Sequence, residues 1–215
     1  MQQRNDHYSS EAGMLGTMFK GAMAGAVGVW AMDRLDWFLF RNEDPQASHR
    51  TEQVRPQGLD PAHVAAKKAA RLMGTSLQPA QTHPAGVAIH YALGIGPATV
   101  YAAMRERLPV TAQGQDFLYG MGLGLGLFLI QDEGLNQLMG LSGKQKDYPW
   151  QAHARGLAAH LVLGLTINMA LNVMRAPRSV PQQLHPFDER FIEKVSEHIS
   201  VISDRDRAYP SASTH

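Results

Sequence analysis

The histidine and carboxylate side chains at the ends of four apolar stretches are the groups of this chain that could do acid–base chemistry. A histidine beside a carboxylate can exchange a proton near neutral pH, and its packing can change when it does so. The order of the stretches along the chain predicts that seven such residues meet on one side of the folded protein. They are Asp33, Asp36, His90, Asp132, Glu133, His153 and His160. We therefore expect a buried polar cluster that takes up and releases protons.

Other roles for this cluster stay open at the level of the sequence. Hydrogen bonds between histidines and carboxylates could simply tie the helices together. His90 and His160 could ligate a metal or a haem, although no paired-histidine motif accompanies them. The chain has no serine–histidine elbow, HExxH, P-loop or dinucleotide fingerprint, and the glycine-rich run at 120–126 lacks the spacing and flanking strand of a nucleotide loop. We expect no catalytic residue, no enzymatic activity, no cofactor and no metal.

Four glycine-rich apolar stretches have to position the cluster. They cover residues 14–32, 84–104, 117–137 and 156–174. The second and the fourth contain no charged residue, and at about 1.5 Å per residue each is long enough for a hydrocarbon core of about 30 Å. Consecutive helices reverse direction, so the ends of the first and third meet the starts of the second and fourth. The sequence predicts an all-α, polytopic membrane protein: a four-helix transmembrane bundle with small helices outside the membrane.

A soluble helical bundle and a signal peptide both fit the apolar stretches less well. The helices of a soluble bundle normally show a polar face, and the second and fourth stretches show almost none. Lys20 and the apolar run after it resemble a signal peptide, but three more apolar stretches follow. Aromatic residues also gather at both expected membrane interfaces, as they do in spanning bundles. On one side they are Trp30, Trp37, Tyr148 and Trp150, and on the other Tyr101, Phe117 and Tyr119.

Small residues at helical spacing predict which helix faces pack together. Lipid gives helices no hydrophobic reason to associate, so close backbone contact at small residues has to supply the attraction. The packing positions are expected at Gly21, Gly25, Gly86, Gly94, Gly122, Gly126, Gly156 and Gly164. His90, Glu133 and His160 lie on the same faces, which directs them toward the interior. The four-residue glycine spacings also suit a homo-oligomer.

The polar regions divide the chain into a membrane domain with two polar ends. Residues 1–12 form a polar N-terminal segment, and residues 13–175 form the membrane domain. Residues 176–215 form a soluble tail, and apolar residues at helical spacing predict an amphipathic helix at 187–203. This helix has to bury its apolar stripe, either against the bundle or against a protein partner.

A polar loop at 41–83 interrupts the membrane domain after the first apolar stretch. The sequence predicts irregular chain up to a short helix at 60–74. Asp60 can cap the N-terminus of this helix, Pro61 is favourable in its first turn, and Gly74 is favourable at its C-terminal end. One face of this helix is expected to be cationic. It consists of His63, Lys67, Lys68 and Arg71.

Composition excludes several classes of protein. The formal net charge of the 215 residues is +1, and no basic stripe interleaved with aromatics is present, so we expect no nucleic-acid binding. Cysteine is absent, which excludes disulfides, thiolate metal sites and cysteine nucleophiles. Basic residues are divided equally between the two expected sides of the membrane, so the positive-inside rule assigns no orientation.

Four segments together resemble the YagU family of bacterial inner-membrane proteins, which carry a domain of unknown function. The segments are residues 21–36 (GAMAGAVGVWAMDRLD), 86–91 (GVAIHY), 131–134 (QDEG) and 148–164 (YPWQAHARGLAAHLVLG). The resemblance implies a multi-pass helical protein of the inner membrane with a part in acid tolerance and no established enzymatic activity. It implies no particular site residues. The alternative is a non-catalytic accessory or scaffold subunit of a membrane complex that docks through the helix at 187–203.

Overall fold

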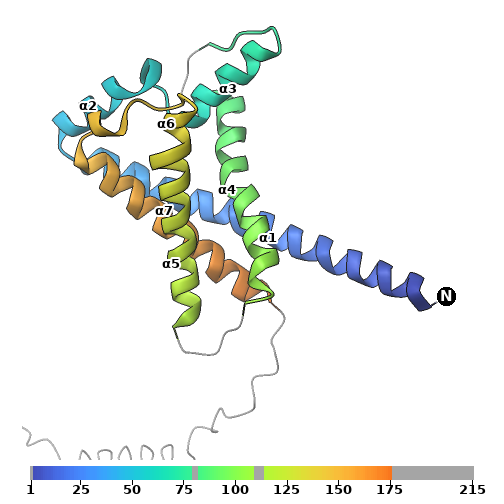
Figure 1. The fold of residues 1–215 in the computed structure, drawn as a ribbon. Helices are drawn as coiled ribbons and strands as arrows, with labels where there is room; N and C mark the ends of the chain where they lie inside the picture. Colours follow the sequence, from blue (N-terminus) through green and yellow to red (C-terminus); the bar gives the residue numbers. More distant parts are fainter. Residues whose placement is uncertain (1, 79–81, 109–113, 176–215) are drawn as a thin grey trace, which may run out of the picture. The chain divides into compact units, whose positions relative to one another are not determined.

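The computed structural model describes residues 2–78, 82–108 and 114–175, with side chains described from residue 13 onward. Every element in these ranges is a helix, so the predicted all-α class is confirmed (Figure 1). The long helices are α1 (Gln2–Asn42), α4 (Pro84–Arg105), α5 (Gln115–Leu127) and α7 (Trp150–Met174). The short ones are α2 (Pro45–Val54), η1 (Pro56–Gly58), α3 (Pro61–Leu72), η2 (Phe128–Leu135), α6 (Asn136–Leu138) and η3 (Gln145–Asp147).

The chain divides into two units, Met1–Met174 and Arg175–His215. The second unit lies outside the described residues except for Arg175. The predicted tail at 176–215, its amphipathic helix at 187–203 and the docking of a partner there therefore stay predictions.

Helix α1 packs along both α4 and α7 (Figure 1). A Cβ added to Gly21 would lie 2.6 Å from the Cα of Thr99, and one added to Gly25, a turn later, 2.8 Å from the Cα of Ile95. As the residue number increases along α1, the residue number of the contact on α4 decreases, so the two helices are antiparallel. On the other side, Gly28 lies against Leu163 of α7.

Helix α5 packs on α7 through glycines of both helices. A Cβ added to Gly120 would lie 3.1 Å from the Cα of Leu165, whereas one added to Gly124 would overlap the carbonyl oxygen of His160. Gly164 in turn touches the carbonyl oxygen of Gly120. Because these helices are also antiparallel, the end of α5 and the start of α7 meet on one side, as the sequence predicts.

Two of the described helices, α4 and α7, are long and apolar enough to cross a membrane by length and composition. Only 22% and 39% of their apolar windows is buried, whereas a core helix of a soluble protein is mostly buried. The predicted four crossings thus reduce to two helices that pass this test. The first stretch does not pass because the charged residues Lys20 and Asp33 enclose a short apolar run in α1. In the third stretch the α-helix ends at Leu127, so the helix itself is short.

The third stretch differs from the single helix expected over 117–137. Helix α5 gives way to the π-helix η2, which is followed by the short α6. A π-helix has more residues per turn than an α-helix, so it rotates the following side chains away from their expected direction. Asp132 and Glu133 both lie in this segment. Their predicted faces, which assumed a continuous α-helix, therefore need correction.

The polar regions contain more helix than the sequence indicates. Helix α1 begins at Gln2, so residues 2–12 of the predicted N-terminal segment form the start of the first helix. Residues 45–54, expected as irregular chain, form α2. Asp44 caps it by accepting from the backbone N–H of Gln46 at 2.7 Å, and Pro45 occupies its first turn. This is the same start signal that identifies α3, and it could have been read from the sequence.

Helix α3 lies within the predicted helix at 60–74, and Asp60 accepts from the backbone N–H of His63 at 3.0 Å. The expected cationic face is only partly exposed. The His63 side chain is buried, and its ring fills the space that the absent side chain of Gly86 leaves on α4. Gly86 is therefore a packing position, but between α3 and α4.

Six of the eight expected packing glycines make close contacts, and two do not. A Cβ added at Gly122 or Gly126 would meet no atom within 4 Å. Gly120 and Gly124 face α7 in their place, because they are offset by two residues and so point to the opposite side of the helix. The prediction chose the wrong one of two overlapping glycine spacings.

Gly124→Val is expected to lower the free energy of unfolding by about 1–3 kcal/mol, because the new side chain would be forced into the backbone of α7 at His160. Thermal unfolding of the purified protein in detergent, followed by circular dichroism, measures the loss. Gly122→Val is the matched control in the same helix, and it should unfold like the wild type. Equal losses in both variants would contradict the packing of α5 on α7.

Candidate functional site

A histidine–carboxylate pair between η2 and α7 is the centre of the candidate site. Nδ1 of His153 lies 2.7 Å from Oε1 of Glu133, and Nε2 of the same ring lies 3.1 Å from the carbonyl oxygen of Gln145. Both side chains of the pair are about one-third exposed. The π-helix presents Glu133 to α7, and the first turn of α7 carries His153.

Both ring nitrogens of His153 face oxygens that ordinarily accept hydrogen bonds. A neutral imidazole has one N–H, so it can donate to the Glu133 carboxylate or to the Gln145 carbonyl but not to both. Both bonds form only when the pair holds one more proton, either on the ring or on the carboxyl group. The geometry therefore suits a group that binds a proton and holds it between two side chains.

Asp132 lies next to this pair and close to the buried His160. Its Oδ1 accepts from Nδ2 of Asn136 at 3.1 Å, and its Oδ2 lies 3.6 Å from Nδ1 of His160. That nitrogen also lies 2.9 Å from the carbonyl oxygen of Gly156, one turn earlier in α7. A Cβ at Gly156 would come within 3.3 Å of Oδ2, so the glycine leaves room for the carboxylate.

A cavity of about 120 Å³ opens beside these residues. Its lining includes Asp36, Asp132, Glu133, Tyr148, His153 and Arg155. The volume is sufficient for several water molecules, and the polar lining offers them hydrogen-bond partners. Protons from solution can therefore reach the carboxylates and the imidazole through water.

Tyr148 is a polar group of the lining that lies between the apolar stretches. Burial raises the pKa of its hydroxyl above the ordinary value, so the group keeps its proton at neutral pH. The hydroxyl oxygen accepts from the backbone N–H of Gly143 at 3.2 Å, and the ring meets His153 edge-on. Tyr148 thus helps to hold the imidazole in position without changing its own charge.

His90 and Asp33 form a second pair, between α4 and α1. Nε2 of His90 lies 2.7 Å from Oδ1 of Asp33, and about one-third of each side chain is exposed. Neither residue lines the cavity. The structure therefore brings the seven expected residues to one end of the helices. Asp36, Asp132, Glu133 and His153 line the same cavity, whereas His90 and Asp33 form a pair apart from it.

Asp36 has a partner that the sequence analysis missed. Its Oδ1 accepts from Nε of the buried Arg155 at 3.0 Å, and the same guanidinium binds Glu43 and lies over the ring of Phe40. Arg155 immediately precedes the uncharged run of α7, a position that could have marked it as a candidate. No sequence signal pointed to Glu43, which follows the last turn of α1.

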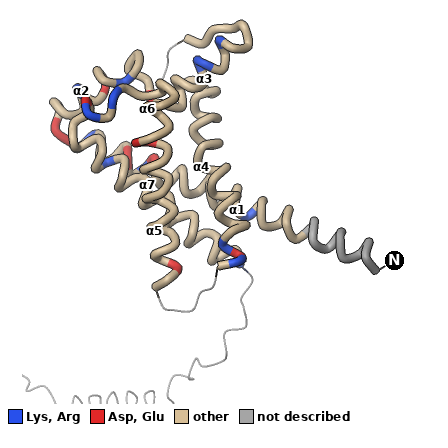
Figure 2. Tube along the Cα trace, in the orientation of Figure 1, with Lys and Arg blue, Asp and Glu red and all other residues tan. Residues whose placement is uncertain are grey.

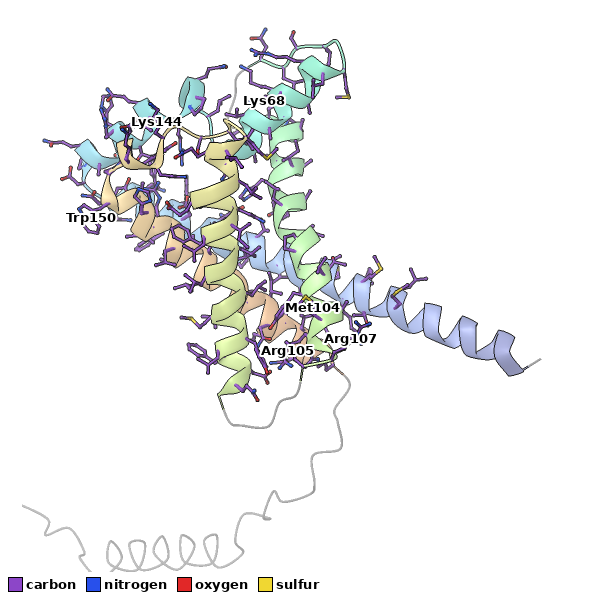
Figure 3. All side chains as sticks on the ribbon, viewed as in Figure 1. Lys68, Met104, Arg105, Arg107, Lys144 and Trp150 are labelled. Atoms are coloured by element: carbon purple, nitrogen blue, oxygen red, sulfur yellow. The ribbon has the colours of Figure 1, made fainter. Side chains whose placement is uncertain are left out.

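A second polar group lies at the opposite end of the helices and was also missed. Arg105, 1% exposed, forms an ion pair with Asp116 and lies 4.7 Å over the ring of Tyr119. The amide of Asn168 accepts from the hydroxyl of Tyr101 at 2.7 Å and donates to the carbonyl oxygen of Asp116 at 2.8 Å. These contacts join α4, α5 and α7 at the end marked by Arg105 in Figure 3.

Figure 2 shows the charged residues gathered toward the two ends of α4 and α5, with uncharged lengths between them. The sequence could have indicated the Arg105 group, because Arg105 follows the second uncharged stretch directly and Asp116 precedes the third.

Within the part of the chain that the structure describes, no group of three or more His, Cys, Asp or Glu side chains is arranged to hold a metal ion. His90 and His160, the candidates for a metal or haem, have separate carboxylate neighbours. The arrangement suits proton exchange and ion pairing.

The chain matches no family model, no curated protein and no solved structure. The resemblance to the YagU family is thus a prediction that these comparisons do not support.

Proposed function

We propose that this chain is an integral protein of the bacterial inner membrane that responds to protons through its histidine–carboxylate pairs. In this proposal α1 and the α5–η2 segment cross the membrane beside α4 and α7. The exposed apolar side chains on the four long helices and on η2 support it. They include Phe19, Val27, Val100, Leu118, Ile130 and Met169. Lipid is the solvent that such a surface fits.

The observation that carries the proton role is the placement of His153 between two accepting oxygens beside a polar cavity. Uptake of a proton completes both hydrogen bonds, and release leaves one of them unmade. Because His153 lies on α7 and Glu133 on η2, the protonation state acts on the contact between these two segments. The polar group around Arg105 at the other end of the helices is separate from this pair. We therefore propose that protons bind at one face of the membrane and are not conducted through it.

Acid tolerance is the physiological role that we attach to this proton response. The resemblance to the YagU family suggests it, and a proton-binding cavity at one membrane face provides a physical basis. The chain in this role needs no cofactor and performs no catalysis.

Glu133→Gln and His153→Gln are expected to abolish protection of cells against acid, because either change removes the shared proton site. The measurement compares survival and cytoplasmic pH after a shift to acidic medium, in cells that lack the chain and are complemented with each variant. His90→Gln and Asp33→Asn test the second pair in the same way. His49→Gln is the control, since His49 is an exposed histidine of α2.

Cells with Glu133→Gln or His153→Gln should fall to the survival of cells without the chain, while His49→Gln should match the wild type. Membrane fractions establish that every variant is present at the normal level. Full protection by all four pair variants at normal levels would refute the proton role.

A further inference from the structure

A stripe of alternating tryptophan and arginine follows the outer face of α1 over its last three turns. Trp30, Arg34, Trp37 and Arg41 are spaced by four, three and four residues, which places them on one face of the helix. The guanidinium carbon of Arg34 lies 5.9 Å from the ring centre of Trp30, and that of Arg41 lies 4.6 Å from the ring centre of Trp37. Both indoles are more than half exposed. We call these four residues the Trp–Arg stripe.

The carboxylates of the same helix end are engaged elsewhere. Asp33 pairs with His90, and Asp36 binds Arg155 together with Glu43. Among the described residues, neither Arg34 nor Arg41 has a carboxylate within ion-pair distance. The acidic side chains thus neutralise the interior, while the stripe presents two uncompensated positive charges outward.

The stacking leaves the hydrogen-bonding edge of each arginine accessible. A guanidinium that lies on an aromatic face can still donate from its edge, and its fork of N–H groups matches the oxygens of a phosphate. Tryptophan itself prefers the level of the lipid headgroups. The stripe begins where the uncharged run of α1 ends at Met32, which is the interface level in the proposed membrane arrangement.

We propose that the Trp–Arg stripe binds the phosphate headgroups of anionic phospholipids. This inference rests on the proposed membrane crossing and adds a preference for one class of lipid. Two arginines about seven residues apart, or about 10 Å along the helix, can each bind one headgroup. Zwitterionic lipids carry the same phosphate, but their choline group compensates its charge and weakens the attraction.

The test uses the full-length protein purified in detergent and native mass spectrometry with added phosphatidylglycerol or phosphatidylcholine. The wild type should retain phosphatidylglycerol preferentially. Arg34→Gln/Arg41→Gln should weaken that binding roughly tenfold for each arginine, the effect of losing one charge-assisted hydrogen-bonded contact. Lys144→Gln/Lys146→Gln is the matched control, because it removes the same charge from two exposed residues of the segment before α7. Figure 3 labels Lys144.

Loss of phosphatidylglycerol confined to the arginine variant supports the site. Equal loss in the lysine control, or unchanged binding in the arginine variant, overturns it in favour of general surface charge or of another occupant such as an acidic protein segment. Failure of the underlying membrane proposal is distinguishable: the wild type would then stay soluble without detergent and retain neither lipid.

Discussion

Arg105→Gln is expected to lower the free energy of unfolding by about 1–3 kcal/mol, because the buried end of α4 loses its ion pair with the partly exposed Asp116 and its hydrogen bond to Asn168. The Arg105 side chain is fully buried and joins α4 to Asp116 at the start of α5 and to Asn168 of α7. Glutamine cannot supply the charge, so Asp116 would be left without its cation. Chemical unfolding in detergent, followed by circular dichroism, measures the change.

Arg107→Gln provides the control for this prediction. Arg107 lies at the same end of α4 but is exposed, so its replacement should change the unfolding free energy by less than about 0.5 kcal/mol (Figure 3). Equal unfolding free energies for the two variants would show that the contacts of Arg105 do not hold α4, α5 and α7 together.

Arg155→Gln is expected to destabilise the other end of the helices by about 3–5 kcal/mol, because it leaves the buried Glu43 without a cation. The Arg155 side chain is 5% exposed and binds both Asp36 and Glu43, and Glu43 is itself 9% exposed. Removing the guanidinium leaves two carboxylates close together without a counter-charge. The same unfolding measurement applies, with Arg50→Gln as the control, because Arg50 is exposed and donates only to the carbonyl oxygen of Asp147 among the described residues.

A combined variant separates charge from packing at this position. Arg155→Met with Asp36→Asn and Glu43→Gln removes all three charges together and should recover much of the stability, because no charge is then left uncompensated. If this variant were no more stable than Arg155→Gln, the loss would come from packing against Phe40 and not from the ion pairs.

The sequence predicted the antiparallel arrangement of the helices better than it predicted which face of each helix packs against its neighbours. Reversal at each loop was sufficient to place Asp33, His90, Glu133 and His153 at one end of the helices, but it did not assign which of them pair with each other. The angles between side chains around an ideal α-helix were sufficient to predict that Gly21 and Gly25 face a neighbouring helix, because both lie in a regular α-helix. They did not decide between the two overlapping glycine spacings of α5, and they failed beyond Leu127, where the π-helix changes the number of residues per turn.

The two buried arginines show a different limit. Arg105 and Arg155 each adjoin an uncharged stretch. From the sequence, an arginine at such a position is expected to be exposed and to mark the boundary of the membrane. The burial of both arginines depends on partners that belong to other elements, Asp116 of α5 and Glu43 after α1, and on the aromatic rings that they cover. Spacing within one helix carries no information about such partners, which come from the packing of several helices.

The central claim is that the His153–Glu133 pair binds a proton in response to acid. Nuclear magnetic resonance of ¹⁵N-labelled histidine in the membrane-reconstituted protein tests it directly, with His153→Gln used to assign the signal. We predict that acidification protonates the second nitrogen of His153 and that Glu133→Gln changes this response while the response of His49 stays as in the wild type. A His153 signal that remains that of a singly protonated ring on acidification, or that ignores the Glu133 substitution, would contradict the account.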